Sequence, residues 1–138
     1  MIKKAGVNRR QFLALTFCLG GPALIGPYRM WSALAERMGR TLSQHLIAVL
    51  NDRESARVIG LAYLRSVPQE ADVQVLVELI ALGFVGGSEL LRNATGEKLR
   101  QLLDLRIRQD FAEERMVTLH GWLLSLTEAR LCALATLV

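Results

Sequence analysis

We predict the fold from residues 72–82 outward; they read DVQVLVELIAL. Valine, leucine and isoleucine recur on two sides of this segment at helical spacing, which predicts a helix that is apolar nearly all round. Such a helix is buried at the centre of a fold or against a partner. Its eleven residues are too few to span a bilayer. Gly83 is expected to form its C-terminal cap.

Two further helices are predicted on the N-terminal side of this segment. Residues 41–50 carry leucine and valine on one helical face, at i, i+4, i+7 and i+8. Asp52 can cap the second helix. That helix ends before Pro68, because the residue preceding a proline resists the helical conformation. Ala56 and Gly60, four residues apart, would let a neighbouring helix approach closely.

A fourth helix is predicted on the C-terminal side, after an apolar, glycine-rich connection at residues 84–87 and an added helical turn within residues 89–92. It runs from about Thr95 to about Glu114. Its expected buried stripe consists of four apolar residues: Leu99, Leu103, Ile107 and Phe111. Five of its charged residues are expected in solvent: Arg100, Asp104, Arg106, Arg108 and Asp110.

The helical period breaks over residues 116–124, where apolar residues around His120 and Gly121 indicate two short extended pieces or an irregular turn. Residues 125–128, SLTE, form a capping box that opens a last helix. The apolar stripe of this last helix is Leu131, Leu134 and Val138. The sequence therefore predicts a mainly all-α fold, a compact bundle of about five helices with a short irregular or hairpin segment before the last one.

An arginine pair near the N-terminus lies within residues 8–13, which read NRRQFL. The segment resembles the twin-arginine (Tat) signal, a bacterial export address read by a translocase that moves folded proteins. Arg9, Arg10, Phe12 and Leu13 match its motif. The resemblance implies that the Tat translocase is a partner and that the exported chain is periplasmic.

The segment after the arginine pair has the remaining parts of a signal peptide. An apolar stretch covers residues 12–25, and Ala33-Leu34-Ala35 is an A-x-A cleavage signal. We therefore expect a signal peptide at residues 1–35 and a single helical domain at residues 36–138. Left uncleaved, this segment would be the chain's contact with the membrane, although its apolar stretch is shorter than the roughly 20 residues of a spanning helix.

The basic character of the chain belongs to its N-terminal part. The chain carries 17 Lys and Arg against 13 Asp and Glu, a net charge of +4. Five of the basic residues and none of the acidic ones precede residue 36, so residues 36–138 carry a net charge of −1. This balance argues against nucleic acid or an anionic membrane surface as a partner of the domain.

The predicted domain offers few groups for catalysis or metal binding. Its histidines are His45 and His120 and its one cysteine is Cys132, too few for a zinc or iron–sulfur site. We expect His45 at the edge of the core, and Cys132 either buried or paired with another chain. His120 lies near Ser125 and Glu128 in the sequence, but helix capping accounts for both of these residues. The sequence thus predicts no enzyme, no cofactor and no metal.

A Tat signal on a domain without a cofactor site indicates either fast folding or travel bound to a larger partner. The second arrangement resembles the small accessory subunits of periplasmic or membrane-associated dehydrogenases, which escort a flavin-bearing catalytic subunit. The resemblance implies a non-catalytic accessory subunit of an exported oxidoreductase. The expected partner interface includes Phe84, Val85, Val117 and Trp122, although core packing of Trp122 is the favoured alternative. The first alternative function is a self-sufficient periplasmic binding domain, and the second is a small enzyme.

Overall fold

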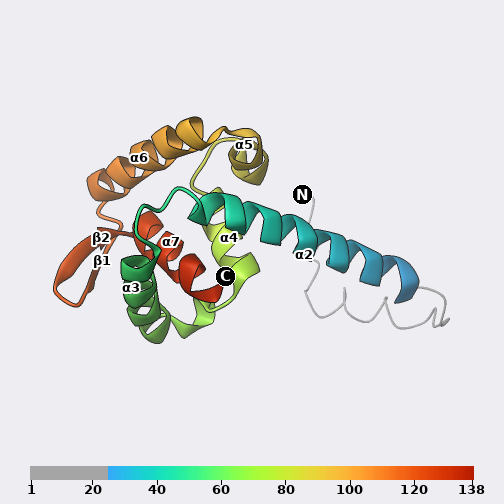
Figure 1. The fold of residues 1–138 in the computed structure, drawn as a ribbon, viewed down its shortest axis with the longest axis horizontal. Coiled ribbons are helices and arrows are strands. Elements are labelled where there is room, and N and C mark those ends of the chain that lie inside the picture. The colour runs from blue at the N-terminus through green and yellow to red at the C-terminus, as the bar shows by residue number, and fades with distance from the viewer. Residues whose placement is uncertain (1–24) are drawn as a thin grey trace, which may run out of the picture. The chain divides into compact units, whose positions relative to one another are not determined.

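A computed structural model describes residues 25–138, with the backbone alone described at 25–29, 35, 36 and 38–40 (Figure 1). The described part is mainly helical, with one short antiparallel hairpin before the last helix, which confirms the predicted fold class. In chain order the elements are α2 (Ile25–Ile47), α3 (Arg53–Ser66), the 3-10 turn η2 (Pro68–Glu70), α4 (Val73–Ala81), α5 (Gly87–Asn93), α6 (Gly96–Ala112), β1 (Met116–Leu119), β2 (Trp122–Ser125) and α7 (Leu126–Leu137).

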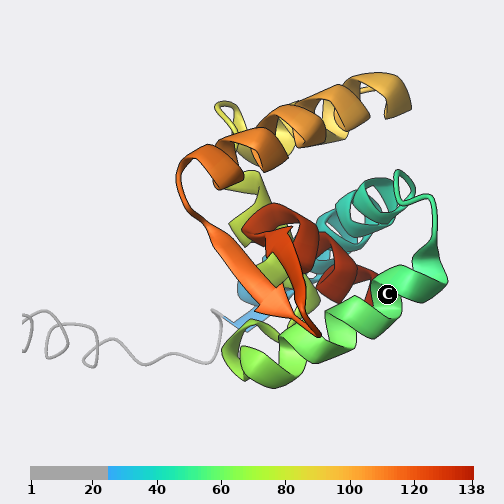
Figure 2. The same ribbon diagram turned by 90° about the vertical axis from the view of Figure 1, so that its left-hand side faces the viewer.

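Helix α7 is the centre of the unit formed by residues 34–138. Helices α3, α4 and α6 and both strands of the hairpin pack against it (Figure 2). Its buried residues occur on every side of the helix: Thr127, Ala129, Leu131, Cys132, Ala133, Leu134 and Ala135. Alanines contribute three of these positions, and their small side chains let neighbouring elements approach from several directions. The predicted stripe of α7 is confirmed at Leu131 and Leu134 and wrong at Val138, which is exposed.

Of the two alternatives predicted for residues 72–82, the central position is therefore wrong, and burial against a partner stays a prediction. Helix α4 buries one face, which carries Leu76, Val77 and Ile80, whereas Val75 and Leu82 on other sides are 36% and 80% exposed. The apolar composition of α4 thus exceeds what the fold covers. Gly83 is not the predicted cap either, because Leu82 is the C-cap in a right-handed conformation.

Helices α3 and α7 approach each other closely at Gly60. A Cβ at this position would collide with the main-chain carbonyl oxygen of Cys132 and with the hydroxyl of Thr136. The Arg57 Nε also donates a hydrogen bond to the carbonyl oxygen of Ala135, at 3.1 Å. These contacts confirm the close approach predicted from Ala56 and Gly60.

Local capping signals define the helix starts as predicted. The Asp52 carboxylate accepts hydrogen bonds from the backbone N–H groups of Glu54 and Ser55, at 3.0 and 3.1 Å. At the start of α7 both halves of the capping box are present: the Ser125 hydroxyl accepts from the Glu128 N–H at 3.0 Å, and the Glu128 carboxylate accepts from the Ser125 N–H at 2.9 Å. These bonds fix where α3 and α7 begin.

Helix α2 begins at Ile25, far earlier than the predicted start at Thr41. Pro27 lies in its first turn, where the missing N–H of a proline is not needed for helical hydrogen bonding. Leu42, Leu46 and Ile47, at its C-terminal end, lie in the core. Leu42 and Leu46 belong to the apolar face predicted for residues 41–50. No helix within residues 25–138 combines the length and apolar character needed to cross a membrane.

Candidate functional site

The hairpin β1–β2 is held in a fixed position by its base. Glu114 takes a positive φ of 57°, which ends the helical run of α6 and redirects the chain into β1. His120 and Gly121 form the two-residue turn with φ values of 50° and 81°, as the tight turns of hairpins require. At the base, the Leu126 N–H donates to the carbonyl oxygen of Arg115 at 3.0 Å. The hairpin alternative predicted for this segment is confirmed.

The tip of this hairpin presents apolar side chains to solvent. Cross-strand partners share a face of the sheet, so Val117, Leu124, Leu119 and Trp122 lie on one side. The first three pack in or against the core, whereas Trp122 lies at the tip and is 71% exposed. Leu123, on the opposite face, is 56% exposed. The prediction that Trp122 packs in the core is therefore wrong. The alternative, that Trp122 contacts a partner, stays a prediction.

A second exposed apolar segment follows α4. Phe84 is half-buried and packs against the core, while Val85 beside it is 99% exposed. Leu82, at the start of this connection, is 80% exposed, so two aliphatic side chains, those of Leu82 and Val85, lie largely in solvent. Of the four predicted interface residues, Val85 and Trp122 are therefore exposed, and Phe84 and Val117 support them from the core side.

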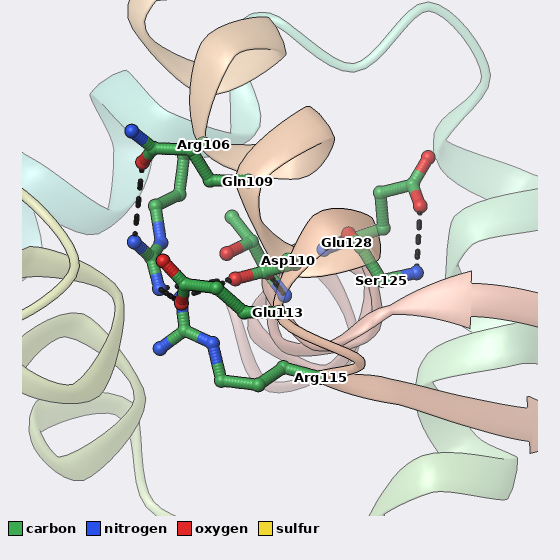
Figure 3. A network of polar contacts seen from close by, with 8 residues as sticks. Arg106, Gln109, Asp110, Glu113, Arg115, Ser125 and Glu128 are labelled. Atoms are coloured by element: carbon green, nitrogen blue, oxygen red, sulfur yellow. Dashed lines mark hydrogen bonds and ion pairs between the residues drawn. The ribbon is translucent and has the colours of Figure 1, made fainter.

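A buried ionic cluster joins α6 to α7, and we call it the Asp110 clamp (Figure 3). The Oδ1 of Asp110 accepts from Arg106 at 3.0 Å and from Arg115 at 2.7 Å, and its Oδ2 accepts from the Thr127 N–H at 2.8 Å. Asp110 is 1% exposed and Arg106 is 9% exposed. The prediction that Arg106 and Asp110 face solvent is therefore wrong. Burial of the two side chains is possible because they form an ion pair and because Asp110 accepts the Thr127 N–H, which has no partner within α7.

The buried face of α6 also differs from the predicted stripe towards the end of the helix. Leu99 and Leu103 are buried as expected, but Ile107 is half-buried and Phe111 is 40% exposed. Arg106 and Asp110 are buried on this helix instead. Gly83 makes this possible, since a Cβ there would lie 2.8 Å from the Arg106 Nε.

A second polar cluster links α3, η2 and α7. Arg130 donates two hydrogen bonds to the Glu70 carboxylate, at 2.8 and 2.9 Å, and the Tyr63 hydroxyl donates a third at 2.8 Å. The hydrogen bonds from Arg130 lower the pKa of Glu70. Burial, and then the bond to Glu70, raise the pKa of Tyr63 to about 12. The cluster is internally satisfied, which indicates a structural role.

A groove of about 400 Å³ lies between α3, α6, β2 and α7. Its apolar lining includes Ile59, Leu103 and Leu124, and Cys132 is also among the lining residues. Burial raises the pKa of Cys132 to about 11, so the thiol stays protonated at neutral pH. Cys132 is buried, as one of the two predicted alternatives requires.

The other candidate chemical groups lie apart. His45 is half-buried at the edge of the core, as predicted, with its Nε2 2.9 Å from the carbonyl oxygen of Ala94. His120 is exposed at the hairpin turn, while Ser125 and Glu128 bond to each other's backbone in the capping box. Among the residues whose side chains the structure describes, no group of three or more His, Cys, Asp or Glu is placed to hold a metal ion.

The predicted export residues Arg9, Arg10, Phe12 and Leu13 lie outside the described residues. Ala33 and Ala35, the predicted cleavage residues, lie within α2. Comparison of the chain with family models, with curated proteins and with solved structures finds no match.

Proposed function

We propose that this chain is a non-catalytic accessory subunit of an exported oxidoreductase. It docks a larger, cofactor-bearing partner and supplies the twin-arginine signal that directs both to the periplasm. The observation that carries the proposal is the exposed Trp122 on a hairpin whose base is fixed. Tryptophan is enriched among the residues that contribute most to protein–protein binding. A rigid element that presents it also loses little conformational entropy on association.

Other exposed apolar residues are compatible with the same function. Val85 and Leu82 project from the connection after α4, and Leu123 projects from the face of the hairpin opposite Trp122. Single exposed apolar residues are common on protein surfaces, so Trp122 carries the argument. The partner's surface is expected to be apolar where it covers the hairpin tip.

The test is affinity purification of the tagged full chain from the periplasmic and membrane fractions of its native host. The proposal predicts that one larger redox protein elutes with the chain in a fixed ratio. Replacing Arg9 and Arg10 by lysine is expected to retain both proteins in the cytoplasm, because the signal of the small chain serves both. Isolation of the chain alone, or export that survives the double replacement, contradicts the proposal.

The groove beside Cys132 favours one alternative, a self-sufficient periplasmic binding domain. Its volume of about 400 Å³ lies within the range of small-molecule sites, and its lining is largely apolar. A well-behaved monomer that co-purifies with a small apolar molecule, identified by mass spectrometry of an organic extract, would establish this alternative in place of the accessory subunit.

A further inference from the structure

A cavity of about 150 Å³ adjoins the Asp110 clamp. The C-terminal end of α4 forms one wall, with Leu79, Leu82 and Gly83, and the start of α7 forms another. Three guanidinium groups, those of Arg106, Arg115 and Arg130, line the cavity together with one carboxylate, that of Asp110. Two further carboxylates, those of Glu70 and Glu113, pair with these arginines from outside the cavity.

The counterions of these arginines are unevenly distributed. Arg130 is neutralised by its two hydrogen bonds to Glu70. Arg106 and Arg115, by contrast, share a single oxygen of Asp110, whose other oxygen is occupied by a backbone N–H. Two buried or half-buried guanidinium groups thus compete for one buried carboxylate.

The second counterion of this pair is a surface residue. Glu113 lies 2.7 Å from the Arg115 Nη2 but 3.8 Å from the Arg106 Nη2, and its side chain is 55% exposed. An ion pair with so exposed a partner contributes little, because water screens it and holding the side chain costs entropy. Glu113 is consequently easy to displace by another carboxylate.

One donor of the pair also lacks an acceptor. The Nε of Arg115 is buried and has no hydrogen-bond partner among the described residues. Leaving a buried donor unpaired is costly, and a guanidinium group can bind a carboxylate through two parallel hydrogen bonds. The Arg115 Nε is itself closed off from solvent, so the shared Asp110 oxygen and the exposed Glu113 are the features that favour an additional oxyanion, bound at the terminal nitrogens of the two arginines.

We propose that this cavity binds a carboxylate group, which takes the place of Glu113 as the second counterion of Arg106 and Arg115. The volume of the cavity, about 150 Å³, is sufficient for a group the size of acetate. Two sources present this chemistry: a free small carboxylic acid, and the side chain of an aspartate or glutamate on a protein partner. The inference does not depend on the proposed accessory function.

The test is a titration of the ¹⁵N-labelled full chain with sodium acetate, with sodium chloride at matched ionic strength as the reference. The Nε–H resonance of Arg115, assigned from its loss in Arg115→Lys, reports binding directly. We expect a saturable shift with acetate that chloride does not reproduce. Equal responses to the two salts, or no response of this resonance, would overturn the proposal.

Two variants and a control sharpen the test. Glu113→Gln removes the competing carboxylate and is expected to tighten acetate binding by about two- to five-fold, the range of an exposed ion pair. Gly83→Ala places a Cβ 2.8 Å from the Arg106 Nε and is expected to weaken binding. Arg108→Gln, at an exposed position of the same helix, is expected to leave it unchanged. Should Gly83→Ala fail to fold, Glu113→Gln decides alone, and an unchanged affinity refutes the proposal.

The two sources are distinguished by repeating the titration on the chain bound to any protein that co-purifies with it. A partner side chain in the cavity abolishes the acetate response of Arg115, whereas a site for free acids retains it. This second titration identifies the source of the carboxylate, whereas the first titration decides whether the cavity binds a carboxylate.

Discussion

Substitution of Gly60 by alanine tests whether the contact of α3 with α7 organises the core. The added methyl group would meet the carbonyl oxygen of Cys132, an atom of the main chain of the central helix. A flexible side chain can move away from such a group, but a main-chain carbonyl in a buried helix cannot. One of the two helices must therefore shift.

The magnitude follows from two opposing terms. Overpacking of a core costs about 1–3 kcal/mol, and the rigid obstacle at Gly60 places this site at the upper end of the range. Alanine in place of glycine inside a helix returns about 1 kcal/mol through its higher helix propensity. We expect a net loss of about 2 kcal/mol in the free energy of unfolding, which lowers the Tm of a domain of this size by roughly 8–16 °C.

Urea unfolding followed by far-UV circular dichroism measures this loss. Gly96→Ala is the matched control, because a Cβ at Gly96, also in a helix, meets no atom within 4 Å. We expect Gly96→Ala to leave the free energy of unfolding unchanged or to raise it by about 0.4–1 kcal/mol. If Gly60→Ala were as stable as Gly96→Ala, α3 and α7 would not pack as closely as described, and the argument for α7 as the centre would fail.

Three further predictions concern the cap, the acid response and the thiol. Ser125→Ala removes the acceptor of the Glu128 N–H and is expected to cost about 1 kcal/mol in urea unfolding; an unchanged midpoint would contradict the capping account. Because the pKa of Glu70 is lowered in the folded state by Arg130, its contribution to stability is present above the ordinary pKa of about 4.3 and is lost as the pH falls through the folded value. Thermal melts between neutral pH and about pH 3 should thus show a weaker acid dependence in Glu70→Gln than in the unchanged chain, and parallel curves would refute this. Alkylation of Cys132, followed by mass spectrometry of its peptide, should be slow in the folded chain until the pH approaches its raised pKa of about 11, and equal rates in the folded and urea-unfolded chain would exclude burial.

Features that depend on a few neighbouring residues could be predicted from the sequence. The cap at Asp52 and the capping box of Ser125 and Glu128 each involve groups within three residues, so the local pattern contains the whole interaction. The hairpin turn at His120 and Gly121 belongs to the same class, since the backbone conformation is set by the turn itself. Both caps are confirmed, and of the two alternatives predicted for the segment around His120 and Gly121 the structure shows the hairpin.

Features that depend on distant partners could not be predicted in this way. The burial of Arg106 and Asp110 requires the backbone N–H of Thr127 and the open space at Gly83, both of them on other elements. Charged residues on a helix are normally solvated, and the spacing of these two residues, i and i+4, was the one available signal for an ion pair. The exposure of Trp122 likewise depends on how far the hairpin tip extends beyond the core.

The central functional claim is that the chain binds a larger protein through the tip of its hairpin. The most direct measurement compares the amount of co-purifying protein, per molecule of tagged chain, between Trp122→Ser and Leu105→Ser, both changes at exposed apolar positions. We predict that Trp122→Ser lowers the amount of co-purifying protein by about 30-fold or more, which is the effect of removing a dominant interface residue. Leu105→Ser is expected to leave this amount unchanged. Both variants are expected to have the Tm of the unchanged chain. Equal recovery of the partner by both variants would contradict the claim.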